Sequence, residues 1–266
     1  MNNLDFFSGQ AEVTVEYHES TPSTQLRARE LAREGKLKAI VVAKEQTAAR
    51  GRLARRWEAP KGSGLYFSIL FRPELPPATA HLVNVAAALS VAEAVRSLLG
   101  LELRLKWPND LLLPQASPAE DEGDKKVCGI LSESATRNGV IDYCVTGIGL
   151  NLYKPPSFPA EVATRAGWLR QTERERIDET ELLARIVRNF FRWVDALERE
   201  GTAPMLKIYR ERCASVSRVL EVETSEETLR GLCLGIGEHG ELILETPVGP
   251  RRFYVADVVH ARLGSG

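Results

Sequence analysis

Two apolar segments separated by Asn138-Gly139 place the strongest constraint on how this chain can fold. Residues 127–134 and 141–148 have the apolar content of β-strands, and an Asn-Gly pair between two such runs is typical of a tight hairpin turn. An antiparallel strand pair is therefore expected here. Further short strands are predicted at 39–43, 65–71, 103–106 and 111–113.

Helical patterns alternate with these strands. Ser23-Thr24, followed by apolar residues at helical spacing and then Gly35, predicts a capped amphipathic helix. Longer helices are predicted at 79–99 and 178–200, each ended by a glycine, and Thr202 is expected to cap another helix.

From Val216 onward the pattern changes to short alternating strands with turns. This change predicts two domains. Residues 1–214 form an α+β domain, and residues 215–266 form a small β domain that we expect to be a barrel.

The charge balance and the cysteines exclude several classes of protein. The chain has 35 basic and 36 acidic residues, so it is not a general binder of polyanions. We find no apolar run near the roughly 20 residues that cross a bilayer and no signal peptide at Met1–Phe7, so no membrane partner is expected. The four cysteines form no CxxC pair, which argues against a zinc site or a disulfide framework and favours a reducing, cytoplasmic location.

Positive charge is nevertheless concentrated in the segment 50–57, where four arginines surround Gly51 and precede Trp57. Arginine presents a planar fork that suits phosphate or carboxylate oxygens, and an indole offers a flat face to a base or a sugar. The alternative interpretation is an ordinary solvated basic loop.

Residues 235–240 match GxGxxG, the glycine pattern of dinucleotide-binding turns. That mechanism requires a helix to begin at the motif, whereas residues 241–245 alternate as a strand. A hairpin turn is therefore predicted at 235–240. The chain also contains no GxxxxGK[ST] phosphate-binding loop.

Four segments, taken in order, resemble biotin protein ligases. They are Ser23-Thr24-Gln25, the segment 45–57 (similar to QTxGRGRRGRxW), an intact KWPND at Lys106–Asp110, and Lys126–Glu133 (similar to KLxGILxE) with Gly147–Asn151 after it. The resemblance covers about residues 20–154. The departures are Gln25 for asparagine, Ala49 for glycine, Leu53 for arginine and Ala54 for glycine. The loop is expected to be stiffer than usual, because alanine resists positive φ.

The resemblance implies a mixed β-sheet covered by helices, as in class II aminoacyl-tRNA synthetases and biotin ligases, with a C-terminal SH3-like barrel. It implies that ATP and Mg²⁺ activate biotin as biotinyl-5′-AMP, and that biotin then passes to a lysine of a biotin carboxyl carrier domain. About twenty residues precede Ser23, too few for a helix-turn-helix domain, so no DNA partner is expected. A homodimer is an open alternative to a monomer.

Joining a carboxylate to a phosphate brings two anions together, which requires compact positive charge and exact alignment. We expect Arg52, Lys126 and Asp110 to be catalytic, and Asp110 is also the candidate Mg²⁺ ligand. The expected biotin site comprises Ser23, Thr24, Gln25, Gln46, Arg50, Gly51, Arg52 and Lys126. The expected ATP site comprises Arg52, Arg55, Trp57, Lys106, Asn109 and Asn151.

These residues also have purely structural interpretations. Ser23 and Thr24 can cap a helix, Trp57 can be a core aromatic residue, and Asp110 can stabilise a turn. For the function, one alternative is a lipoate or octanoate ligase of similar fold. Another, from a different class, is a non-enzymatic, biotin-responsive transcription regulator.

Overall fold

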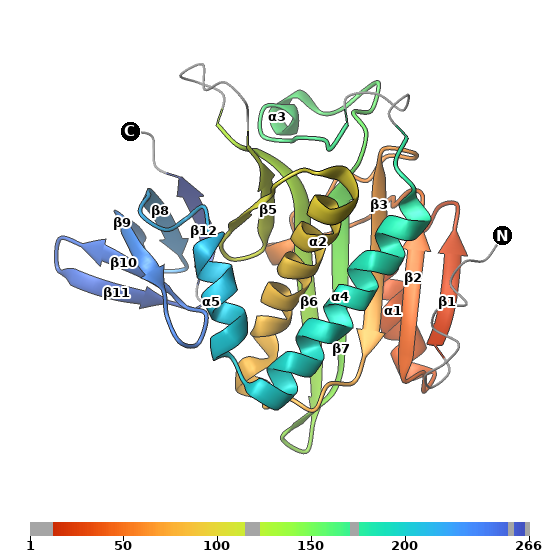
Figure 1. The fold of residues 1–266 in the computed structure, drawn as a ribbon, viewed down its shortest axis with the longest axis horizontal. Coiled ribbons are helices and arrows are strands. Elements are labelled where there is room, and N and C mark those ends of the chain that lie inside the picture. The colour runs from red at the N-terminus through yellow and green to blue at the C-terminus, as the bar shows by residue number, and fades with distance from the viewer. Residues whose placement is uncertain (1–12, 115–122, 171–175, 255–257, 264–266) are drawn as a thin grey trace.

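A computed structural model describes residues 13–114, 123–170, 176–254 and 258–263 (Figure 1). The larger of its two sheets has seven strands in the spatial order β1-β2-β3-β7-β6-β5-β4. Only β1 and β2 pair in parallel, so the sheet is mixed, as expected. The strands are β1 (Val13–His18), β2 (Lys38–Ala43), β3 (Gly64–Phe71), β4 (Arg104–Lys106), β5 (Asp110–Leu113), β6 (Lys125–Arg137) and β7 (Val140–Asn151).

The predicted hairpin is present as β6 and β7. Asn138 (φ 52°) and Gly139 (φ 80°) both adopt the left-handed backbone that such a turn needs. The hairpin sets Gly129 opposite Gly149 and Leu131 opposite Gly147. On its other side β7 pairs with β3, which is buried along its whole length.

Strand β1 was missed by the sequence analysis. It lies at the sheet edge, beside β2 only, and its residues are mostly half-buried. Charged and polar residues interrupt its short sequence, VTVEYH, so it lacks the continuous apolar run of a central strand.

Helices cover both faces of the larger sheet, because neighbouring residues of each strand point to opposite faces. Ala39 and Val41 pack under α1 (Thr24–Arg33), whereas Ile40 and Val42 belong to the main core. That core is covered by α2 (Val83–Leu99) and α4 (Glu179–Glu200), which pack against each other (Figure 1).

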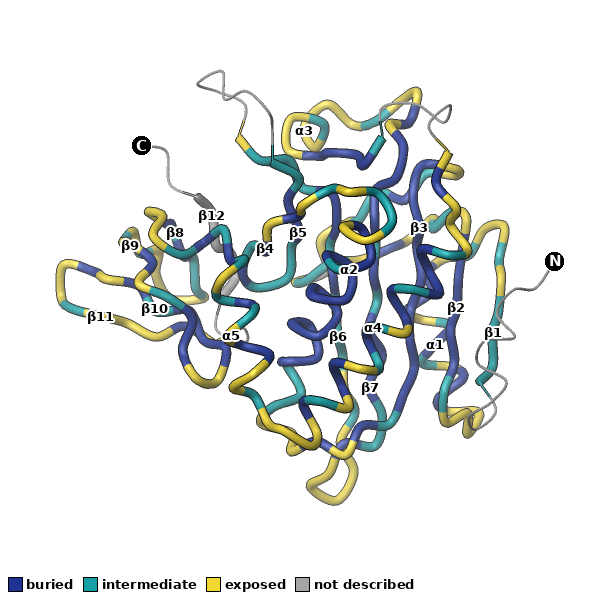
Figure 2. The backbone as a smooth tube through the Cα atoms, in the orientation of Figure 1, coloured by how far each residue is buried: buried dark blue, intermediate teal, exposed yellow. Residues whose placement is uncertain are grey.

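The segment Pro77–Leu99 joins a 3-10 turn, η3 (Pro77–Leu82), to α2. Its 23 residues include an 18-residue window of mean hydropathy 1.5, long and apolar enough by composition to cross a membrane. The expectation that no apolar run approaches this length is therefore wrong. The helix is apolar on every side because it lies between the sheet and α4: 72% of the window is buried (Figure 2).

The second sheet is antiparallel, with five strands in the order β11-β10-β9-β8-β12. They are β8 (Val219–Thr224), β9 (Thr228–Ile236), β10 (Leu242–Thr246), β11 (Gly249–Phe253) and β12 (Val258–Leu263). Residues 235–240 connect β9 to the antiparallel β10, as the hairpin prediction required. Buried side chains of the second sheet, including Leu220, Ile236 and Leu244, are part of the main hydrophobic core.

Helix α5 (Ala203–Glu211) leads to the second sheet and begins at the predicted place. The expected cap is wrong, however, because the Thr202 side chain makes no capping hydrogen bond. Its hydroxyl donates instead to Glu238 O (3.3 Å), in the β9–β10 turn. The remaining short helices are η2 (Arg52–Ala54) and α3 (Ala160–Ala163). Most of the acidic loop predicted at 114–124 lies outside the described residues.

We predict that Phe190→Ala lowers the free energy of unfolding by about 3–5 kcal/mol, because it leaves a cavity beneath α4. Phe190 is fully buried and packs edge-on against Phe71, with ring centroids 5.1 Å apart. Urea denaturation measures the change. The control Leu37→Ala, at a 59% exposed position, should change stability by no more than about 0.5 kcal/mol.

Candidate active site

A pocket of about 720 Å³ brings together every residue that the sequence analysis proposed for the site. Its lining contains Ser23, Thr24, Gln25, Gln46, Arg50, Gly51, Arg52, Arg55, Trp57, Lys106, Asn109, Asp110, Lys126 and Asn151. These residues come from α1, from the loop after β2, and from β4 to β7.

The floor of the pocket has almost no side chains, because three glycines share one face of β6 and β7. A Cβ at Gly149 would lie 2.6 Å from Trp57 Nε1, and one at Gly129 would lie 2.8 Å from Trp57 Cζ3. A Cβ at Gly147 would lie 2.5 Å from Gln25 Oε1. Glycine therefore allows Trp57 and Gln25 to lie directly against the sheet backbone.

One end of the pocket is polar and uncharged. Ser23 caps α1 by accepting from Leu26 N (3.4 Å) and also lines the pocket, so its structural and site roles coexist. Thr24 follows it, within hydrogen-bond reach of Gln46 and of Ser68, a fully buried serine on β3.

The hydrogen bonds of Thr24 and Gln46 indicate which donors and acceptors this end of the pocket can offer a ligand. The single Thr24 hydroxyl proton has two oxygen neighbours, Ser68 Oγ at 2.8 Å and Gln46 Oε1 at 3.1 Å. When Thr24 donates this proton to Gln46 Oε1, its hydroxyl oxygen can act as an acceptor toward a ligand. Gln46 Oε1 is held by Thr24 N (2.8 Å), which leaves Gln46 Nε2 as a donor.

Gln25 lines the pocket, but its polar atoms are committed to the protein. Its Nε2 donates to Leu131 O (3.2 Å), Val145 O (3.1 Å) and Glu133 Oε2 (3.0 Å). Its Oε1 accepts from Ser68 Oγ (3.3 Å). Gln25 therefore forms part of the wall and fixes Ser68, in place of the ligand contact proposed from sequence.

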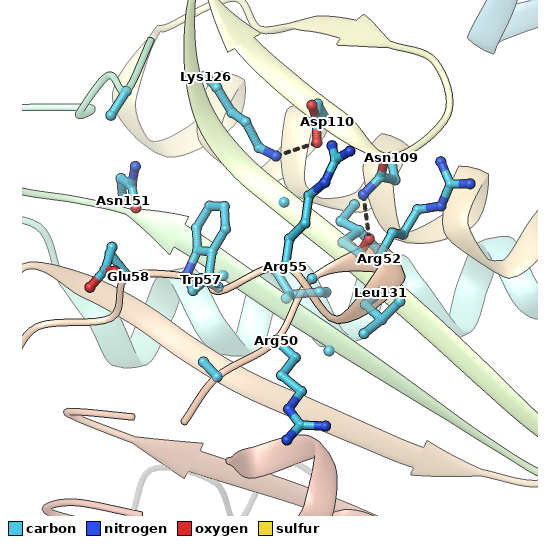
Figure 3. Close-up of a pocket in the computed structure, with 18 of the residues that line it drawn as sticks. Arg50, Arg52, Arg55, Trp57, Glu58, Asn109, Asp110, Lys126, Leu131 and Asn151 are labelled. Atoms are coloured by element: carbon cyan, nitrogen blue, oxygen red, sulfur yellow. Dashed lines mark hydrogen bonds and ion pairs between the residues drawn. The ribbon is translucent and has the colours of Figure 1, made fainter. Parts of the chain in front are cut away.

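The other end of the pocket is cationic. Lys126 Nζ lies 2.6 Å from Asp110 Oδ1 and 5.2 Å from the centroid of the Trp57 ring. Figure 3 shows Arg55 extending toward Asp110, with Arg52 beside Asn109. Burial lowers the pKa of Arg52, and nearby Arg55 adds to this, while Asp110 opposes it. Arginine stays charged in spite of such a shift, so an anion entering here meets several fixed cations.

The arginine loop is folded back on itself. Gly51 N donates to Arg55 O (2.7 Å), and Arg50 pairs with Arg56 in an antiparallel bridge. The Arg50 side chain extends away from Lys126, although it lines the pocket (Figure 3). The left-handed residue of the loop is Leu53 (φ 54°) rather than Ala49, which is buried beside Tyr66. The residue whose side chain restricts a positive φ in this loop is therefore Leu53.

Two amide side chains of the proposed ATP site act as braces. Asn109 Nδ2 donates to Ile130 O (2.9 Å), and Ile130 N donates back to Asn109 O (3.0 Å). Asn151 Nδ2 donates to Gly167 O (3.0 Å). These hydrogen bonds use the side-chain nitrogens. The Oδ1 atoms are therefore the acceptors that each asparagine can offer to a ligand.

The donor set does not form a resident metal site. Within 13–114, 123–170, 176–254 and 258–263 there is no group of three or more His, Cys, Asp or Glu side chains placed to hold an ion. Mg²⁺ commonly binds through one or two carboxylates together with substrate phosphates and water. The single carboxylate of Asp110 fits that mode.

Several lining residues were missed by the sequence analysis. They are Ser68 on the floor and Phe158, Val162, Thr164 and Arg165 at the rim near Lys126. Ser68 could have been identified because it is a small polar residue in the otherwise largely apolar strand 65–71, where a buried hydroxyl needs a hydrogen-bond partner. The rim residues follow the last motif and carry no spacing pattern of their own.

Comparison with known proteins agrees with this geometry. Residues 17–151 match the model of the Biotin/lipoate A/B protein ligase family. The chain is 31% identical over 244 residues to the bifunctional ligase/repressor BirA of Bacillus subtilis, covering 91% of this chain and 72% of the relative. It is 31% identical over 242 residues to the biotin–[acetyl-CoA-carboxylase] ligase of Paracoccus denitrificans, covering 90% and 97%.

Among solved structures, the fold is similar to the biotin protein ligase of Aquifex aeolicus in complex with biotin and ATP. The TM-score is 0.79 at 24% identity, covering 94% of this chain and 99% of that one. The chain therefore belongs to the biotin/lipoate A/B protein ligase family. The named relatives are biotin ligases, in agreement with the resemblance of the motifs.

We predict that Gly149→Ala displaces the Trp57 indole and destabilises the protein by about 1–3 kcal/mol, because the new methyl group overlaps the ring. Urea denaturation and the fluorescence of Trp57, isolated by subtracting a Trp57→Phe background, measure both effects. Gly123→Ala is the matched control, since Gly123 also lines the pocket but has nothing within 4 Å of an added Cβ. Equal effects from the two substitutions would contradict the proposed packing.

Proposed function

We propose that this protein is a biotin protein ligase that activates biotin with ATP and transfers it to a lysine of a biotin carboxyl carrier domain. The observation that carries the proposal is that one pocket joins an uncharged hydrogen-bonding end to a cationic end. Biotin has the matching polarity: a neutral cyclic urea at one end and a carboxylate at the other.

At the uncharged end, a cyclic urea has N–H groups that Thr24 can accept and a carbonyl to which Gln46 Nε2 can donate. The Trp57 indole, packed on Gly129 and Gly149, adds an apolar surface to the pocket lining. A lipoate or octanoate has no N–H group, so Thr24 would be left without a donor. This argues against the lipoate alternative, as do the names of the relatives.

At the cationic end, Lys126 and Arg52 reduce the repulsion between the biotin carboxylate and the α-phosphate. A carboxylate oxygen then bonds to the α-phosphorus while the bond to the bridging oxygen of pyrophosphate breaks. In the second step a lysine nitrogen bonds to the acyl carbon, loses a proton, and AMP leaves. Asp110 is the carboxylate that can orient the incoming amine.

Mg²⁺ that enters with ATP would be held by Asp110 and would neutralise part of the negative charge on the phosphates. Lys106 and Asn109 lie in the same segment as Asp110 and are proposed to contact the nucleotide. Trp57 and Asn151 complete that part of the lining.

Three further assignments accompany the proposal. The short antiparallel strands β8 to β12 support an SH3-like second domain. The names of the relatives support an acetyl-CoA carboxylase carrier as the partner. Four buried free thiols suit a reducing cytoplasm, and burial raises the pKa of Cys144 and Cys233 to about 12, which keeps them unreactive.

The purified protein should add one biotin to a carrier domain in the presence of MgATP, as measured by intact mass spectrometry. Pyrophosphate exchange should depend on biotin, and lipoate or octanoate should not replace it. Exchange driven by lipoate but not by biotin would overturn the assignment.

We predict that Arg52→Gly increases the release of biotinyl-5′-AMP into solution about tenfold or more, because a charged hydrogen-bond donor to the intermediate is lost. Chromatography of a reaction without carrier measures the released adenylate. Arg56→Gly removes a charge from the same loop at a side chain that is 74% exposed, and it should leave release nearly unchanged. Unchanged release from Arg52→Gly would contradict the role given to the loop.

A further inference from the structure

Trp107, the second residue of the KWPND segment, is hydrogen-bonded to the β9–β10 turn of the second sheet. Its Nε1 donates to Gly240 O (3.0 Å), and its backbone N–H donates to Ser215 Oγ (3.2 Å). Trp107 is 2% exposed and Ser215 is 1% exposed, so both hydrogen bonds are shielded from water. Trp107 lines the pocket together with its neighbours Lys106, Asn109 and Asp110.

Gly240 belongs to the β9–β10 turn, whose GxGxxG pattern has no nucleotide-binding context. Arg210 on α5 fixes this turn by donating from Nε to Ile236 O (2.7 Å) and from Nη2 to Gly237 O (2.9 Å). His81 Nε2 donates to His239 O (2.6 Å). The turn is therefore attached to the first domain at several points besides Trp107.

Glycine is required at position 240 for two reasons. Its φ is 78°, in the left-handed region, and an added Cβ would lie 2.7 Å from Leu82 Cδ2. The close approach allows the Gly240 carbonyl to reach the Trp107 indole.

Strand β4, which precedes Trp107, is hydrogen-bonded to the segment that connects α5 to the second sheet. Leu105 N donates to Arg212 O (2.9 Å), and Ala214 N donates to Leu105 O (2.7 Å). On the other side of the segment, Asn109 is bonded to Ile130 of β6. The segment Lys106–Asp110 is thus fixed between β6 and the elements that lead into the second sheet.

We propose that Trp107 is a positioning residue, and that the 235–240 turn of the second sheet sets the affinity of the active site for ATP through it. The proposal rests on the assignment of Lys106, Asn109 and Asp110 to the nucleotide under the proposed function. The hydrogen bonds of the turn described above go to Trp107, Arg210 and His81, whereas the urea-binding end, with Thr24 and Gln46, lies on α1 and the loop after β2.

The test compares Gly240→Ala with Gly249→Ala in the full-length protein. Gly249 is also a left-handed glycine of the second sheet (φ 104°), but an added Cβ there meets nothing within 4 Å. Both substitutions carry the backbone strain of alanine at positive φ, and only Gly240→Ala displaces the contact with Trp107.

Gly240→Ala should raise the KM for ATP about tenfold in pyrophosphate exchange, with the KM for biotin changed less than about twofold. Gly249→Ala should change neither KM. Parallel increases in both KM values, or equal effects of the two substitutions, would overturn the proposal. An inactive wild-type protein would instead contradict the proposed function.

Trp107→Phe provides a second variant, which keeps an aromatic ring and removes the N–H donor. It should also raise the KM for ATP selectively. If both residues act through one hydrogen bond, the double variant should be less impaired than the product of the two single effects. Multiplicative effects would show that Trp107 and Gly240 act independently and would contradict the proposal.

Discussion

The pocket depends on three glycines that share one face of β6 and β7. Gly129, Gly147 and Gly149 leave the backbone of the hairpin uncovered, and the Asn138-Gly139 turn fixes the register that aligns them. Helix α1 packs against β2, β3 and β7 on this side of the sheet. Here the Trp57 indole and the Gln25 amide lie on the bare surface, and they define the wall of the cavity.

The two ends of this cavity differ in charge. Near the Asp110 carboxylate lie the cations of Lys126 and Arg52, with Arg55 close to Arg52, and burial disfavours the charged form of Arg52. An anionic ligand offsets that unfavourable burial, so the excess of positive charge favours a negatively charged occupant. At Thr24 the polar neighbours, Gln46 and Ser68, are uncharged.

The sequence predicted the elements whose patterns are local, such as the β6–β7 hairpin, α4 and the 235–240 turn. It also predicted residues that line one pocket, because their motifs are contiguous even though the motifs meet only in the fold. It did not predict β1, whose edge position leaves it half-polar. Nor did it predict that Gln25 is committed to Leu131, Val145 and Ser68. Such contacts join residues distant in sequence, and no periodicity encodes them.

The length of the β6–β7 hairpin has a practical consequence. Its Asn138-Gly139 tip projects beyond the body of the molecule (Figure 1), and neighbouring Val140 is 62% exposed. The pocket-lining residues Lys126, Gly129 and Asn151 lie toward the opposite end of the same strands. Exposed loop tips tolerate added residues well, so an epitope or a fluorophore-accepting peptide spliced between Asn138 and Gly139 would leave the cavity undisturbed.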